Sequence, residues 1–193
     1  MNKSNVIILA AGYSERMGKP KFLLPFTEKT TFLEHFLEVY SNFGVHKIII
    51  ISQLPNKISK YTANYSNCIL IQNIFPEKGK TFSLSLGLKE SENQDVFIQN
   101  IDNPFIDIEL LKTLQKNLIS QKWVRPVYKN SGGHPILLSK EVVFKIKEKI
   151  DVSQNLRTLL NEYERIDIET NEEKILANIN TPADYKKHFN LSI

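Results

Sequence analysis

The residues best suited to chemistry lie in a short basic loop, residues 9–21, which continues an apolar run near the N-terminus. Small residues around Gly12 let the backbone approach a ligand closely, and successive backbone N–H groups in such a turn can bind an anion. Arg16 adds a planar guanidinium suited to phosphate oxygens, and Lys21 adds a compact positive charge. The loop lacks the spacing of a P-loop and of a dinucleotide-binding turn. It predicts phosphate binding, with an ordinary basic surface turn as the alternative.

Alternating apolar strands and amphipathic helices are predicted to position this loop. Wholly apolar runs such as 47–52 are typical of strands buried on both faces. The apolar stripe in 31–43, with Thr31 as N-cap and Gly44 after its end, is typical of a helix. The same reasoning predicts strands at 6–10, 68–72, 95–99, 123–128, 135–138 and 164–168, and helices at 55–65, 107–120, 141–148, 155–162 and from Pro182. This alternation favours an α/β fold with a mostly parallel three-layer sheet.

Residues 82–88 follow a different pattern, because four apolar residues alternate with serine and glycine. An alternating period predicts a strand there.

Three polar loops, residues 11–21, 74–80 and 100–103, each follow a predicted strand. Ligands of an open parallel sheet bind beyond the carboxyl ends of its strands. We therefore expect the three loops to meet at one cleft.

Five segments, in this order along the chain, resemble motifs of the MobA-like nucleotidyltransferases. Residues 9–21 fit the pattern Leu-Ala-Ala-Gly-x-Ser-x-Arg-Met-Gly-x-Pro-Lys, which is the most specific of the five, and the others are residues 79–88, 101–105, 132–135 and 178–184. Within the family the chain looks most similar to the molybdenum cofactor cytidylyltransferases. The resemblance implies a Rossmann-like α/β fold of the nucleotide-diphospho-sugar transferase type, with residues 1–193 as one domain.

The resemblance also implies a reaction and a set of site residues. An NTP and a phosphorylated acceptor would give a nucleotidylated product and pyrophosphate, with Mg²⁺ as cofactor. Arg16 would hold the β- and γ-phosphates, Lys21 would offset charge at the α-phosphate, and Asp102 would hold Mg²⁺. The implied nucleotide-binding residues are Leu9, Ala10, Ala11, Gly12, Ser14, Arg16, Gly18, Lys21, Gly79 and Ser83, and the implied acceptor-binding residues are Gly133, His134 and Pro135.

Several of these residues have a second interpretation. Asp102 precedes Asn103-Pro104 and could be a turn former. Asn180 is the second implied metal ligand, with Asn178 as the alternative, and it could instead be the N-cap of the helix begun by Pro182. His134 is interpreted as a turn or substrate-contact residue, since the four histidines show no metal-ligand spacing.

The chain departs from the family pattern mainly where the acceptor is expected. Asn100 stands in place of a small or apolar residue, Ile101 replaces a glycine, and residues 150–157 lack two glycines of the usual segment. By resemblance, Ala10-Ala11-Gly12 favours CTP over GTP. The expected acceptor is molybdopterin, with a molybdoenzyme as a possible client. The alternatives are another phosphorylated acceptor, such as a sugar or polyol phosphate, or a non-catalytic nucleotide- or pterin-binding protein.

Composition excludes several other classes of protein. The chain has 193 residues, 7 glycines, 1 cysteine and a net charge of +4. Cys68 can form no internal disulfide and is expected to be a small buried hydrophobe, which fits a cytoplasmic protein. The apolar run after residues 1–5 is too short for a signal peptide, and no run is long enough to span a membrane. No motif predicts nucleic-acid binding, and the charge fits either a solvated surface or anionic substrates.

Overall fold

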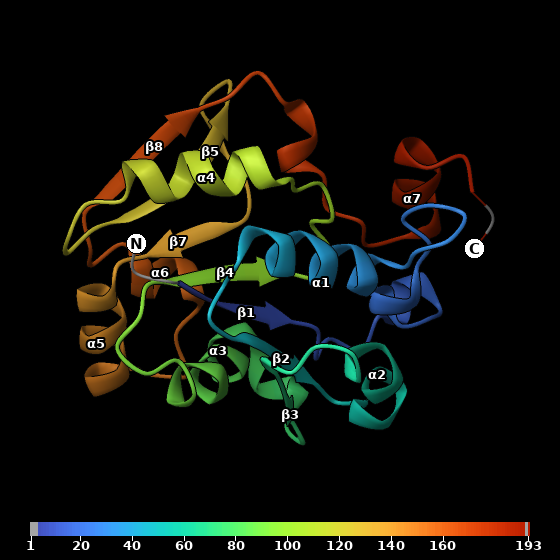
Figure 1. Ribbon diagram of the computed structural model, residues 1–193, viewed down its shortest axis with the longest axis horizontal. Helices are drawn as coiled ribbons and strands as arrows, with labels where there is room; N and C mark the ends of the chain where they lie inside the picture. Colours follow the sequence, from blue (N-terminus) through green and yellow to red (C-terminus); the bar gives the residue numbers. More distant parts are fainter. Residues whose placement is uncertain (1–3, 192) are drawn as a thin grey trace.

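The strands of the described residues form one eight-stranded sheet (Figure 1). The computed structural model describes residues 4–191 and 193, so residues 1–3 of the segment before the first apolar run lie outside it. Along the sheet the order is β3 (Cys68–Gln72), β2 (Ile48–Ser52), β1 (Asn5–Leu9), β4 (Val96–Asn100), β7 (Ile136–Leu138), β5 (Trp123–Tyr128) and β6 (Ser131–Gly132), and β8 (Arg165–Glu169) also pairs with β5. The predicted α/β sheet is confirmed.

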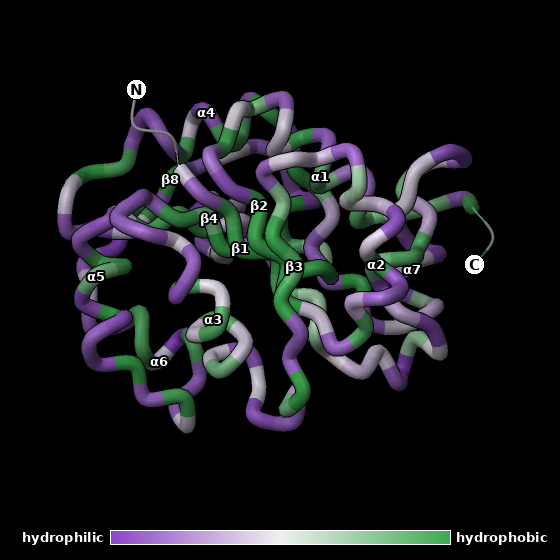
Figure 2. The backbone as a smooth tube through the Cα atoms, turned by 60° about the horizontal axis from the view of Figure 1, so that its bottom comes forward, coloured by the Kyte–Doolittle hydropathy of each residue, from purple (hydrophilic) through white to green (hydrophobic). Residues whose placement is uncertain are grey.

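The sheet is parallel from β3 to β4 and mixed beyond it. β7 runs antiparallel to both β4 and β5, whereas β8 runs parallel to β5. Every residue of β1, β2 and β4 is buried. Because successive side chains point to opposite faces, these strands contribute to a core on each side of the sheet. In Figure 2, where the tube is coloured by residue hydropathy, the hydrophobic residues of these strands lie at the centre of the molecule.

Helices cover both faces, as a three-layer fold requires. On one face lie α1 (Phe32–Phe43) and α4 (Ile108–Asn117), and residues of α2 (Pro55–Thr62) and α7 (Pro182–His188) join the same core. On the other face lie α3 (Gly79–Lys89), α5 (Lys140–Lys149) and α6 (Leu156–Leu160). Four short 3₁₀ helices occur in the described chain: η1 (Glu15–Met17), η2 (Lys21–Leu23), η3 (Pro76–Lys78) and η4 (Glu173–Leu176).

Local signals placed α1 correctly. Thr31 forms a capping box with Glu34, and Gly44 ends the helix in a left-handed conformation with φ 86°. α4 ends at Asn117, earlier than predicted, because Leu118 is extended.

The predicted strand at 82–88 is wrong, since these residues belong to the helix α3. Leu84 and Leu88 are one turn apart and face the sheet together with Ser83 and Gly87, while Phe82 and Leu86 remain half-buried. Small residues on the packed face hid the helical period, and the half-buried apolar residues suggested alternation.

Cys68 is half-buried, and burial raises the pKa of its thiol to about 11. The raised pKa fits the prediction that Cys68 is not a nucleophile, but the residue is only partly buried, whereas a buried one was predicted. No helix of residues 4–191 has the length and apolar character needed to cross a membrane.

Candidate active site

The three loops that follow β1, β3 and β4 line a common cavity of about 200 Å³, which we call the small cavity. Its lining comprises Leu9, Ala11, Gly12, Ser14, Lys21, Pro76, Gly79, Lys80, Ser83, Ile101 and Asp102. The predicted meeting of the three loops is confirmed. It follows from the parallel arrangement of β3, β2, β1 and β4, which brings their carboxyl ends to one edge.

Lys21 lies between two oxygens that come from distant parts of the chain. Its Nζ donates to Asp102 Oδ2 at 3.3 Å and to Asn180 Oδ1 at 2.6 Å. Asp102 is only 9% exposed, and its second oxygen, Oδ1, is buried with no hydrogen-bond partner. The ion pair thus leaves one carboxylate oxygen free toward a further cation or donor.

The segment that carries Asn180 is fixed from both sides. Ile179 N donates to the carbonyl oxygen of Asp102 at 2.8 Å, and Asn180 N donates to Asp184 Oδ2 at 3.0 Å. Thr181, and not Asn180, is the N-cap of α7. Asn178 instead accepts a hydrogen bond from Asn103. The structure therefore brings Asn180, rather than Asn178, to Lys21 and Asp102.

The basic loop makes a tight turn before η2. Ser14 adopts the left-handed conformation with φ 58°, and Lys21 N donates to its Oγ at 3.4 Å. Buried Met17 anchors the loop, and Gly18 is left-handed with φ 76°. Arg16 is exposed and does not line the small cavity. Hydrogen bonds from Thr181 lower the pKa of Asp184, and the charge of Arg16 adds to this effect.

The N-terminus of α3 closes the small cavity on its other side. Gly79 has φ 85°, which suits glycine, and it leads directly into Lys80. Ser83 Oγ donates to Gly79 O at 3.2 Å and accepts from Asn73 Nδ2 at 3.0 Å. A helix N-terminus and an adjacent lysine together favour a phosphate group.

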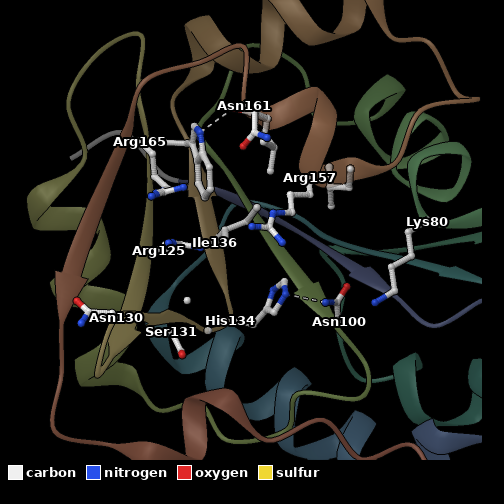
Figure 3. A pocket seen from close by; sticks show the side chains of 15 residues that line it. Lys80, Asn100, Arg125, Asn130, Ser131, His134, Ile136, Arg157, Asn161 and Arg165 are labelled. Atoms are coloured by element: carbon white, nitrogen blue, oxygen red, sulfur yellow. Dashed lines mark hydrogen bonds between the residues drawn. The ribbon is translucent and has the colours of Figure 1, made fainter.

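A second cavity, of about 550 Å³, adjoins the first and shares Lys80 with it; we call it the large cavity (Figure 3). Its lining comprises Lys80, Asn100, Trp123, Arg125, Asn130, Ser131, Gly132, Gly133, His134, Ile136, Leu156, Arg157, Leu160, Asn161 and Arg165. The two cavities therefore lie side by side along the carboxyl end of β4.

The large cavity has a positive lining. Arg125 forms a bidentate pair with Asp167, at 2.7 and 3.1 Å, and Arg165 Nε contacts the same carboxylate at 2.7 Å. Lys80 and Arg157 make no ion pair or side-chain hydrogen bond within the described chain. A Cβ at Gly132 would meet the guanidinium of Arg125, so the arginine lies directly over this glycine. Two uncompensated cations remain for an anionic ligand.

His134 belongs to a buried amide network. Asn100 Nδ2 lies 2.9 Å from His134 Nε2 and 3.1 Å from Asn103 Oδ1. Burial lowers the pKa of His134 to about 4, and the charge of Lys80 adds to this effect. His134 is therefore neutral at pH 7, which suits a contact residue rather than a cation.

The predicted site residues divide between the two cavities. Leu9, Ala11, Gly12, Ser14, Lys21, Gly79, Ser83 and Asp102 line the small cavity, and Gly133 and His134 line the large one. Ala10 is buried in the core, Pro135 is buried behind His134, and Gly18 is exposed in its loop. Sequence reasoning assigned no role to Lys80, Arg125 and Arg157. A charged residue in the otherwise apolar β5 was the signal available for Arg125.

Comparison with known proteins gives consistent results. The sequence profile of the MobA-like NTP transferase domain matches residues 6–166. The molybdenum cofactor cytidylyltransferase of Escherichia coli is 27% identical over 185 residues, covering 96% of this chain and 95% of the relative. A "probable molybdenum cofactor guanylyltransferase" of Carboxydothermus hydrogenoformans is 24% identical, covering 97% of this chain and 95% of the relative.

Solved structures with the same fold include a nucleotidyl transferase from Methanothermobacter, with a TM-score of 0.79, 17% identity and coverage of 97% of this chain and 96% of the other. A Mycobacterium tuberculosis protein solved in complex with manganese has a TM-score of 0.73, 17% identity and coverage of 97% and 98%.

Proposed function

The chain belongs to the MobA-like NTP transferase family and is a nucleotidyltransferase, and from this premise we propose that it transfers CMP from CTP to a phosphorylated acceptor. The observation that carries the proposal is the contact of Lys21 with Asp102 and Asn180 at the edge of the small cavity. Phosphoryl transfer asks a protein mainly to position its substrates and to neutralise charge. We propose that Lys21 neutralises phosphate charge and that Asp102 and Asn180 position the substrate phosphates through a metal ion.

A divalent cation fits the residues at this point. Asp102 Oδ1 is a buried carboxylate oxygen without a partner, and Asn180 Oδ1 is a neutral oxygen close by. The described residues contain no cluster of three or more histidine, cysteine, aspartate or glutamate side chains that could hold a metal. Mg²⁺ is usually held by one or two carboxylates together with substrate phosphates, so we propose Mg²⁺ with Asp102 as its protein carboxylate. When bound, it neutralises phosphate charge.

The two cavities divide the proposed substrates between them. The loop after β1 and the N-terminus of α3 would bind the triphosphate, with Arg16 reaching inward from the rim to the β- and γ-phosphates. A phosphate oxygen of the acceptor attacks the α-phosphorus, the new P–O bond forms, and the bond to the β-phosphate oxygen breaks. Pyrophosphate leaves with both electrons of that bond. Lys21 offsets the charge that develops at the α-phosphate.

No protein nucleophile or strong base is needed, because the attacking phosphate is already ionised. This agrees with His134, whose low pKa of about 4 leaves it uncharged in the acceptor cavity. Lys80 and Arg157 would bind the anionic acceptor there. Lys80 borders both cavities, so it can contact the attacking phosphate.

We propose molybdopterin cofactor as the acceptor. Support comes from the name of the Escherichia coli relative, which covers nearly the whole chain. Sugar and polyol phosphates are the alternative acceptors, since they bring the same phosphate group. The single cysteine fits a reducing compartment, and we propose that the reaction takes place in the cytoplasm.

The nucleotide assignment is tested by ligand-dependent thermal stability. A ligand that binds only the folded state raises the melting temperature. We expect CTP with Mg²⁺ to give a larger shift than GTP with Mg²⁺, and CTP with a chelator to give a smaller one. Because one similar relative is named as a guanylyltransferase, GTP is the informative competitor. A larger shift with GTP rules out the CTP assignment.

A further inference from the structure

Asn100 presents an unpartnered oxygen at the large cavity. It is the last residue of β4, lies just before Asp102 and is only 4% exposed. Its Oδ1 is buried and has no hydrogen-bond partner, although the residue lines the large cavity. A buried acceptor without a partner lowers stability, so its presence in a cavity lining points to a ligand that would satisfy it.

Neighbouring groups fix which end of the Asn100 amide faces the cavity. Asn103 Nδ2 donates to the carbonyl oxygen of Ala177 at 2.8 Å and to Asn178 Oδ1 at 3.1 Å. A carbonyl oxygen can only accept, so the Asn103 amide has one orientation and its Oδ1 must accept. The donor within reach is Asn100 Nδ2, at 3.1 Å.

His134 takes the second hydrogen of the same nitrogen. Its Nε2 lies 2.9 Å from Asn100 Nδ2, so Nε2 accepts and the ring carries its proton on Nδ1. Both amide hydrogens of Asn100 are then used inside the protein. Only Oδ1 remains, and its direction is fixed by the two groups that bind Nδ2, Asn103 Oδ1 and His134 Nε2.

The surroundings of this oxygen define the ligand that would satisfy it. Lys80 and Arg157 line the same cavity without anionic partners, and in Figure 3 the Lys80 side chain extends toward Asn100. The cations suit a phosphate, whereas Asn100 Oδ1 suits a hydrogen-bond donor. A phosphate ester that also carries an O–H or N–H group combines the two.

We propose that Asn100 is a specificity-determining residue, whose Oδ1 accepts a hydrogen bond from an O–H or N–H group of the phosphorylated acceptor. This inference rests on the proposed function and adds a requirement to it. Phosphate esters that bear a donor are accepted, and esters of the same shape without the donor are rejected. A site built around a fixed buried acceptor rejects such analogues strongly, because the acceptor is left unpaired.

Trp123 allows binding to be measured without turnover. It is the single tryptophan of the chain and lines the large cavity. Its fluorescence is titrated with two matched pairs of probes. One pair is erythritol 4-phosphate and butyl phosphate, and the other is 6-hydroxymethylpterin phosphate and its fully N-methylated counterpart. The pairs distinguish a polyol donor from a heterocyclic one.

The test compares the binding of each matched pair of ligands in the wild type and in an Asn100 variant. In the wild type we expect the donor-bearing member of one pair to bind at least about 10-fold more tightly than its partner. Asn100→Leu should reduce this ratio to about 1. The same substitution at an exposed position of α4, Asn117→Leu, should preserve it. If Asn100→Leu does not fold, Asn100→Ala replaces it in the same cycle.

Several results overturn the role of Asn100. These are equal binding of both members of each pair to the wild type, an unchanged ratio in the Asn100 variant, or no response of Trp123 to any phosphate ester. The proposed function is measured separately, by release of pyrophosphate from CTP with an acceptor. Pyrophosphate release without donor discrimination rejects the role of Asn100 alone, whereas absence of release rejects the proposed function.

Discussion

Lys21 joins three parts of the chain that are far apart in sequence. Its contacts reach Asp102, 81 residues away, and Asn180, 159 residues away. The ammonium of Lys21 pairs with Oδ2 of Asp102, and Oδ1 of the same carboxylate has no partner. Asp102 Oδ1, which is buried, is the oxygen that we propose for the cation.

Lys21→Met tests the role of this ammonium. Methionine keeps most of the length and the apolar body of the side chain but removes the charge that we place at the α-phosphate. We expect kcat for pyrophosphate release to fall by about 10²–10³-fold, as for removal of one preorganised charge-stabilising group. The Kd for CTP should change much less.

Lys29→Met is the matched control, because Lys29 is an exposed lysine in a turn outside both cavities. Its kcat should equal that of the wild type. A wild-type kcat in Lys21→Met contradicts the assigned role.

The family motifs predicted individual site residues, but they did not predict how the side chains contact one another. Lys21, Asp102 and Asn180 were expected through resemblance, and the structure brings them together. The amide chain of Asn103, Asn100 and His134 was not predicted. Its three members come from a strand end and two loops, and nothing in the local sequence states which of them face one another.

Helix α3 illustrates how packing overrides a local pattern. The alternation in residues 82–88 favours a strand, yet the segment is helical because Leu84, Gly87 and Leu88 pack on the sheet. Gly87 is the point of closest approach, since a Cβ there would lie 2.7 Å from Ile7 Cγ2. Ile7 is completely buried and cannot move aside freely. The sequence does not reveal this contact, which depends on β1.

Gly87→Val is expected to destabilise the protein by about 1–3 kcal/mol, the usual cost of overpacking a core. The loss should appear as a lower midpoint of urea unfolding with an unchanged m-value. Gly12→Val is the matched control, because no atom lies within 4 Å of a Cβ at Gly12 and its φ is not positive. A midpoint equal to the wild type in Gly87→Val contradicts the close packing of α3 on β1.

At the scale of the whole molecule, the parallel half of the sheet was predictable and the mixed half was not. The apolar runs of β1, β2 and β4 indicate strands buried on both faces, and parallel pairing follows from the intervening helices. The antiparallel insertion of β7 between β4 and β5 depends on long-range pairing. β7 and β5 contribute Ile136, Trp123 and Arg125 to the lining of the large cavity.

Two partly buried histidines predict how stability depends on pH. Burial lowers the pKa values of His35 and His134 to about 4, from 6.5 in the unfolded chain. The unfolded state therefore binds more protons below pH 6.5, and stability is lost as the pH falls from 6.5 toward 4. Between pH 7 and pH 5, His134 should account for a loss of about 2 kcal/mol.

Urea unfolding at pH 7 and pH 5 measures this loss in the wild type and in His134→Gln. The variant should lose less stability over the same interval, because the contribution of His134 is then absent while that of His35 remains. We also propose that residues 1–193 form one domain, which requires a single transition at both pH values. An equal loss in the wild type and in His134→Gln refutes the assignment to His134.

The most direct test follows the CMP group itself. With CTP labelled at the α-phosphate, Mg²⁺ and molybdopterin cofactor, the wild type should transfer the label to the acceptor and release one pyrophosphate for each product. Asp102→Asn, which keeps the shape but removes the charge, should slow transfer by about 100-fold or more. Asp107→Asn, which can retain the N-cap of α4, should leave the rate unchanged. Transfer at the wild-type rate by Asp102→Asn, or label recovered only in free nucleotide, would contradict the proposed transfer of CMP through Asp102.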